Sequence, residues 1–207
     1  MFVKEILKRS AVVSDVLKRQ RIQKWQREGC PFPPPHDVKQ GVLSHYALAH
    51  GLKTLVETGT YLGDMVWSMK DIFERIYSIE LSEELYARAR ERFKAYPNIN
   101  LLQGDSSVRL KDVISQLDSP ALFWLDGHYS GGITAKADKV CPIFEELNAI
   151  FASPIKDHVL VIDDARLFVG EDDYPTYQDL KRFIQTKGNY SVRREGDEIV
   201  VTSSEDR

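Results

Sequence analysis

The chain has 207 residues, of which 43% are hydrophobic and 29% charged, and its formal net charge is −3. These values exclude wholesale disorder and argue against a nucleic-acid coat or a polybasic membrane protein, so we expect one ordinary domain that binds neither nucleic acid nor membrane. Two cysteines are too few for a disulfide scaffold or a four-thiolate zinc site, apolar runs are too short to span a bilayer, and early charges exclude a signal peptide, so a cytoplasmic location is expected.

Residues 1–28 form a basic segment with a net charge of +5, against −8 for the remaining chain. Its apolar residues recur at roughly helical intervals: Val3, Ile6, Leu7, Val13, Val16, Leu17 and Trp25. The pattern predicts one or two amphipathic helices that pack on the domain or form a homodimer, or that cover a site as a lid. Interrupting acids disfavour membrane contact. The Pro-rich stretch 30–36 predicts a stiff connector, so we divide the chain into 1–36 and a domain at 37–207.

From residue 37 onward, predicted helices and strands alternate. Helices are expected at 37–50, 63–74, 83–95 with Ser82 as the N-cap, 108–117, 136–151 and 175–186. Strands are expected at 54–58, 75–81, 99–103, 121–125 and 158–162, and a hairpin at 190–194 and 198–202. This order predicts an α/β fold with a mostly parallel seven-stranded sheet, helices on both faces and a C-terminal antiparallel hairpin.

Acidic residues stand near the carboxyl ends of the predicted parallel strands, where such sheets bind ligands: Glu57, Glu80, Asp105, Asp126, Asp163 and Asp164. Gly59 and Gly63 in the first turn allow the backbone to approach a ligand, although the turn is neither the dinucleotide fingerprint nor a P-loop. Each acid alone is also explained as a turn or helix cap. Together, like charges at one edge require hydrogen-bond donors, a cation or a polar ligand.

The Glu57-Thr58-Gly59-Thr60-x-x-Gly63 turn, Glu80 and Gly104-Asp105 resemble class I S-adenosylmethionine-dependent methyltransferases over about residues 37–203. The resemblance implies a Rossmann-like fold and S-adenosylmethionine as cofactor. Tyr61 stands where many members have a glycine. By resemblance, the turn surrounds the methionine part of the cofactor, Glu80 binds the ribose, and the next strand end faces the adenine. The expected cofactor-binding residues are Glu57, Gly59, Thr60, Tyr61, Gly63, Glu80, Asp105 and Ser106.

The segments Asp126-Gly127-His128 and Asp163-Asp164 resemble small metal-dependent O-methyltransferases of the macrocin O-methyltransferase-like group, and more distantly catechol O-methyltransferase. The resemblance implies that Asp126, which also borders the cofactor, and the Asp163-Asp164 pair hold Mg²⁺ or another divalent cation, which would lower the pKa of an acceptor oxygen. The alternative is a capped turn with solvated acids. His128 is expected to be the general base, or alternatively a polar loop residue. A non-haem iron site is disfavoured because only one histidine is well placed.

The sequence therefore predicts a methyltransferase that acts on an oxygen of a small polar acceptor, one that could include a sugar. Two other functions stay open: a protein on this fold that binds the cofactor without transfer, and a metal-dependent hydrolase. The acceptor pocket is expected from variable loops, namely 1–36, 128–136 and 165–175.

Overall fold

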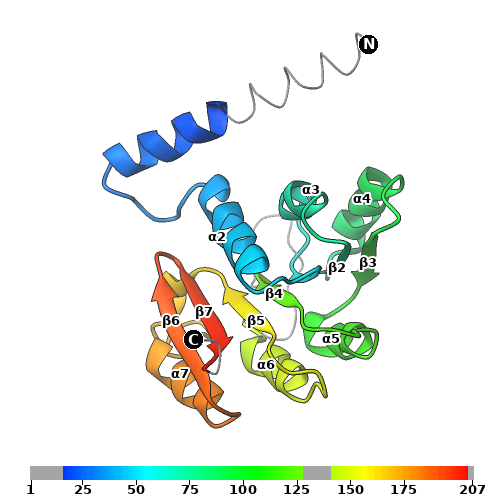
Figure 1. Cartoon of the computed structure of the whole chain (residues 1–207), viewed down its shortest axis with the longest axis vertical. Helices are drawn as coiled ribbons and strands as arrows, with labels where there is room; N and C mark the ends of the chain where they lie inside the picture. The colour runs from blue at the N-terminus through cyan, green and yellow to red at the C-terminus, as the bar shows by residue number, and fades with distance from the viewer. Residues whose placement is uncertain (1–15, 128–140, 205–207) are drawn as a thin grey trace.

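The computed structural model of the chain describes residues 16–127 and 141–204. A seven-stranded sheet runs through it in the order β3-β2-β1-β4-β5-β7-β6 (Figure 1). The strands are β1 (Thr54–Thr58), β2 (Arg75–Glu80), β3 (Ile99–Gln103), β4 (Leu122–Leu125), β5 (Val159–Ile162), β6 (Tyr190–Glu195) and β7 (Glu198–Ser203). Strands β1 to β5 pair in parallel, whereas β7 is antiparallel to β5 and β6. The predicted fold class is confirmed.

Helices cover both faces of the sheet (Figure 1). On one face lie α2 (His36–Ala49), α3 (Asp64–Met69) and α4 (Glu83–Phe93), and on the other lie α5 (Ser106–Ile114), α6 (Ile143–Phe151) and α7 (Tyr177–Gln185). A 3₁₀ turn, η1 (Ala165–Leu167), follows β5. Because both faces are covered, every residue of β4 and β5 is buried, which explains why these strands are apolar throughout.

Several helices begin or end elsewhere than predicted. Helix α3 ends at Met69 instead of residue 74, because the chain turns so that Phe73 packs into the core. Helix α5 begins two residues early, because Asp105 Oδ1 accepts a hydrogen bond from Ser107 N (2.8 Å) and caps it. Thr176 caps α7 in the same way. Residues 141–142 precede α6 and are not helical, and 136–140 lie outside the described residues.

The N-terminal segment is helical over residues 16–27, as its apolar spacing predicts; residues 1–15 lie outside the described part. Arg21 joins this helix to α2, with Nε 2.6 Å from Asp37 Oδ2 and Nη2 3.1 Å from Oδ1. These hydrogen bonds from Arg21 lower the pKa of Asp37. Within residues 16–127 and 141–204, no helix combines the length and apolarity needed to cross a membrane.

Glu146 is a fully buried acid on α6. Ser106 Oγ, at the start of α5, donates a hydrogen bond to Glu146 Oε1 (2.6 Å). Burial raises the pKa of Glu146 from 4.5 to about 7, because a carboxylate loses its hydration in the core. Glu146 therefore connects α5 to α6 and is held best in its protonated form.

Replacing Glu146 with Gln is expected to remove part of the pH dependence of stability. The folded-state pKa lies above the usual value, so the folded chain binds more protons than the unfolded chain between about pH 4.5 and 7. The stability that protonated Glu146 contributes is fully present below about pH 4.5 and is lost as the pH rises through about 7, a change of roughly 3 kcal/mol. Urea unfolding of wild type and Glu146→Gln at several pH values measures this difference.

The exposed Glu171 offers a control, since Glu171→Gln should leave the pH profile unchanged. A wild-type stability that exceeds that of Glu146→Gln by the same amount at every pH would contradict the raised pKa.

Candidate functional site

The strand register brings the predicted acids to one edge of the sheet. Thr58 of β1 lies between Ile79 of β2 and Leu125 of β4, and Leu125 lies beside Ile162 of β5. The residues that follow are therefore neighbours: Glu80, Gly59, Asp126 and Asp163 in order across the sheet. Asp126 N donates to Thr58 O (3.2 Å), and Asp163 N donates to Leu125 O (3.0 Å). The carboxyl edge carries one continuous row of candidate ligands.

Glu80 is buried, and two backbone amides hold its carboxylate at this edge. Tyr61 N donates to Oε2 (2.7 Å), and Ser82 N donates to Oε1 (2.8 Å). Each carboxylate oxygen can accept further hydrogen bonds. The donor set thus fixes a carboxylate next to the glycine turn, which suits recognition of a pair of hydroxyls.

The turn after β1 depends on left-handed backbone conformations at Gly59 (φ +85°), Tyr61 (φ +49°) and Gly63 (φ +77°). A Cβ on Gly59 would lie 2.3 Å from the carbonyl oxygen of Asp126, and one on Gly63 would lie 2.7 Å from the Phe93 ring. Both positions therefore require glycine. Tyr61 adopts the left-handed conformation without being glycine, and its side chain is exposed.

Four other predicted cofactor residues have intramolecular partners. Ser78 Oγ donates to Glu57, and burial raises the pKa of Glu57 to about 8. Ser78 also bonds Thr60 Oγ1 (2.6 Å). At the next strand end, Asp105 caps α5, and Ser106 is buried against Glu146. The structure thus places these residues at the predicted edge and gives each a structural role there.

Asp126, Asp163 and Asp164 come together and are called the acidic cluster below. One carboxylate oxygen from each lies within 4.8 Å of the others. Asp163 is buried, and its Oδ1 accepts from Asp164 N (2.8 Å). Asp164 adopts a left-handed conformation (φ +57°) that turns the chain into η1. Burial and the neighbouring Asp163 hold the pKa of Asp126 well above its usual range, so Asp126 favours its protonated form.

Lys39 of α2 extends its ammonium into the acidic cluster. Lys39 Nζ donates to Asp163 Oδ2 and lies 3.6 Å from Asp164 Oδ1. It also lies 5.9 Å from the centre of the Trp124 ring, and its side chain is only 13% exposed. Burial lowers the pKa of Lys39, but the hydrogen bond to Asp163 and the charges of the three acids of the cluster together raise it by more, so the group is held as an ammonium. Sequence reasoning missed this residue.

Two further ionisable residues, one basic and one acidic, lie close to the acidic cluster. Arg166 Nη1 lies 2.9 Å from Asp164 Oδ1 and also contacts the buried Asp197. Glu198, at the start of β7, lies beside Asp163 in the antiparallel register, and burial together with Asp163 raises its pKa to about 7. Neither Arg166 nor Glu198 has a sequence signal beyond its charge.

A magnesium ion suits the donors of the acidic cluster but not the space that Lys39 leaves. Carboxylates are ligands that Mg²⁺ prefers, and its ligands at 2.0–2.1 Å lie at most roughly 4.2 Å apart. In this structure the Lys39 ammonium takes the position beside Asp163 and Asp164 that such an ion would need. The cluster as it stands therefore does not fit Mg²⁺, and magnesium binding stays a prediction.

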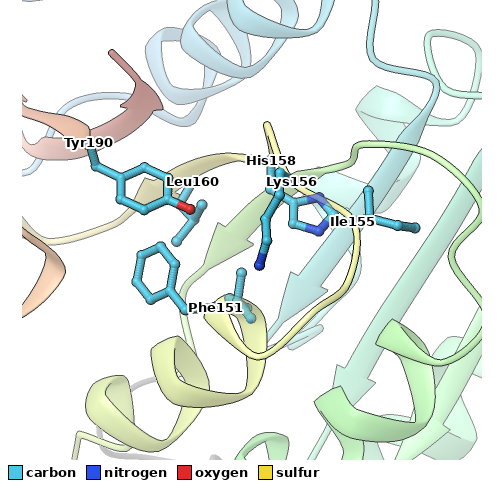
Figure 2. A pocket seen from close by; sticks show the side chains of 7 residues that line it. Phe151, Ile155, Lys156, His158, Leu160 and Tyr190 are labelled. Carbon is cyan, nitrogen blue, oxygen red and sulfur yellow. The ribbon is translucent and has the colours of Figure 1, made fainter. Parts of the chain in front are cut away.

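His128 and the loop 128–136, predicted to supply the general base and acceptor contacts, lie outside the described residues. His158 immediately precedes β5, at the amino end of the strand and so at the opposite edge of the sheet, where its Nδ1 accepts from Ala121 N (3.0 Å). Figure 2 shows His158 among the side chains that line a small hollow. Burial lowers its pKa to about 4. The hollow beside it has a volume of only about 10 Å³, room for about one water molecule. His158 is therefore a structural residue.

Known proteins share this fold. An O-methyltransferase from Bacillus cereus in complex with SAH has a TM-score of 0.61 at 16% identity, over 92% of this chain and 94% of that one. The O-methyltransferase TomG from Streptomyces achromogenes, involved in tomaymycin synthesis and in complex with SAM, has a TM-score of 0.59 at 15% identity, over 90% of this chain and 89% of that one. The predicted resemblance to class I methyltransferases is confirmed at the level of the fold.

Matches found by sequence cover a smaller share of the chain. Ribosomal RNA small subunit methyltransferase A from Dehalococcoides mccartyi is 34% identical over 71 residues, which are 33% of this chain and 24% of that protein. The chain thus spans less than a quarter of the length of this curated relative. No protein-family model matches the chain.

Replacing Gly59 with Ala is expected to destabilise the fold by about 2–4 kcal/mol, because the new Cβ combines backbone strain with a clash against the Asp126 carbonyl. Gly51→Ala is the matched control: Gly51 also has a positive φ (+63°), but no atom lies within 4 Å of its Cβ position. That variant should lose only about 1–2 kcal/mol. Chemical denaturation of both variants gives the comparison, and equal losses would contradict the close approach.

Proposed function

We propose that the chain is a methyltransferase that transfers the methyl group of S-adenosylmethionine to an oxygen of a small polar acceptor. The observation that carries the proposal is the row at the carboxyl edge of the sheet, where Glu80, the Gly59 turn and Asp126 are adjacent on a methyltransferase fold. Solved structures with the same fold hold SAM or SAH, which supports the choice of cofactor.

In this proposal the residues of the turn and of the first three strands bind the cofactor. Glu80, already fixed by two amides, accepts hydrogen bonds from the ribose hydroxyls. The turn from Glu57 to Gly63 contacts the methionine part of S-adenosylmethionine, and Asp105 and Ser106 lie beside its adenine. When bound, the cofactor would supply a methyl group on a sulfonium sulfur: the acceptor oxygen would bond to the methyl carbon as the carbon–sulfur bond breaks, and a neutral thioether would leave. The residues of the chain then act by aligning the acceptor with that methyl group.

In the sequence, β4 is followed by Asp126, Gly127 and then His128. We propose that it removes the proton from the acceptor hydroxyl, since an imidazole titrates near neutral pH. The magnesium requirement is the weaker part of the sequence prediction: the carboxylates of the acidic cluster support it, and Lys39 opposes it. Chelation tests this part alone, because loss of turnover would support the cation and undiminished turnover would oppose it.

A small acceptor agrees with the named O-methyltransferase structures, while the curated relative with 34% identity is a ribosomal RNA methyltransferase. The net charge of −3 weighs against RNA, because phosphate binding requires a basic surface. We also propose that the N-terminal helix forms a homodimer contact. Exposed apolar side chains at Val16 and Leu17 on this helix, and at Phe32 in the segment after it, support this proposal. The division of the chain after residue 36 stays a proposal.

Two rival functions predict different measurements. A binding protein on this fold would take up S-adenosylmethionine and turn over none of many acceptors. A metal-dependent hydrolase would release phosphate or cleave esters in the presence of metal and would not bind S-adenosylmethionine.

Calorimetry should detect S-adenosylmethionine binding, and Glu80→Ala should weaken it. Each charge-assisted hydrogen bond lost is worth roughly 1.5–3 kcal/mol, so affinity should fall by at least about tenfold. Glu83→Ala is the control, because Glu83 is an exposed acid three residues away in the first turn of α4. Equal affinity of wild type and a folded Glu80→Ala would remove Glu80 from the site.

His128→Ala should lower turnover by about 10²–10⁴-fold while the affinity for S-adenosylmethionine stays unchanged. If His128 is the base, the rise of the wild-type rate with pH through the ordinary histidine range should disappear in the variant. His45→Ala, on the exposed side of α2, serves as the control. A variant that retains full turnover would exclude His128 as the base.

A further inference from the structure

We propose that the Lys39 ammonium is the built-in cation of the acidic cluster and that it keeps divalent metal ions out. This inference goes beyond the proposed function, because it concerns which cation neutralises the cluster and holds whether or not a methyl group is transferred.

The position of Lys39 is the first argument. Its Nζ contacts the buried Asp163 directly and lies 3.6 Å from Asp164. Helix α2 is packed onto the sheet through Leu43, Tyr46 and Ala47, so the lysine is presented from a fixed element. Its side chain is almost as enclosed as the acid that it contacts, at 13% against 1% exposed. The contact is therefore part of the packed structure and not a surface ion pair.

The balance of charge is the second argument. Asp164 also faces Arg166, at 2.9 Å, so two cationic side chains lie against the Asp163-Asp164 pair. A divalent ion in the cluster would lie within a few ångströms of the Lys39 ammonium, and like charges so close repel strongly even at the effective dielectric constant of a protein. Binding of the ion would require Lys39 to withdraw and lose its partner.

Direct metal titration tests the inference. The full chain, stripped of metal, is titrated with Mg²⁺ alone in a calorimeter, as wild type and as Lys39→Met and Lys39→Gln. Both substitutions remove the charge, and glutamine keeps a hydrogen-bond donor for Asp163 in case methionine prevents folding. The neutral variants should bind Mg²⁺ at least about tenfold more tightly than the wild type. Lys39→Arg keeps the charge and should bind as weakly as the wild type.

Lys70 provides a matched control. Its side chain is 14% exposed and pairs with the exposed Asp71, so Lys70→Met removes an equally enclosed charge away from the cluster. It should leave Mg²⁺ binding unchanged. Adding Asp163→Asn to Lys39→Gln should abolish the gained affinity.

Two results would overturn the inference. Neither neutral variant could gain affinity for Mg²⁺ over the wild type. Alternatively, Lys39→Arg could gain as much as the neutral variants, which would mean that charge is not what excludes the ion.

Discussion

Burying carboxylates at the edge of a parallel sheet costs free energy unless each one has a partner, and this requirement organises the whole carboxyl edge. The parallel register places the acids side by side, and the compensating groups come from elsewhere in the chain. Glu57 accepts a hydrogen bond from a hydroxyl, and Glu80 accepts two from backbone amides. Asp163 pairs with an ammonium and Asp164 with a guanidinium. Glu57, Asp126, Glu146 and Glu198 also have raised pKa values, because burial favours their protonated forms. The cost of burying these acids is thus offset by donors, cations and protonation rather than by a single partner.

Local sequence patterns were enough to predict the strands of the sheet and the edge at which the acids lie. Strands 54–58 and 99–103 have the predicted bounds, because each is a short run flanked by polar residues and closed by a glycine, Gly59 or Gly104. The acids at the strand ends could be assigned to one edge because parallel strands share their direction. Helix α5 was misjudged at its start, since the pattern did not reveal that Asp105 serves as its cap.

The partners of the acids could not be predicted, because they depend on contacts distant in sequence. Lys39 is 124 residues from Asp163, and on a helix a lone lysine indicates only a solvated face. Glu198 meets Asp163 because β7, and not β6, pairs with β5, a choice that a hairpin pattern leaves open. On α2, Lys39 is two residues from Asp37, which binds Arg21. One helix therefore holds the N-terminal segment at its first turn and the acidic cluster just beyond it.

The contact between Gly59 and the carbonyl of Asp126 has a consequence for protein engineering. The turn that borders the proposed cofactor site and the strand end that begins the acidic cluster touch through their backbones, with no side chain between them to absorb a change. Libraries that vary residues 58–63 to alter cofactor preference would shift Asp126 as well. Redesign of acceptor or cation preference is better begun at α2 and η1, whose side chains reach the cluster without passing through that backbone contact.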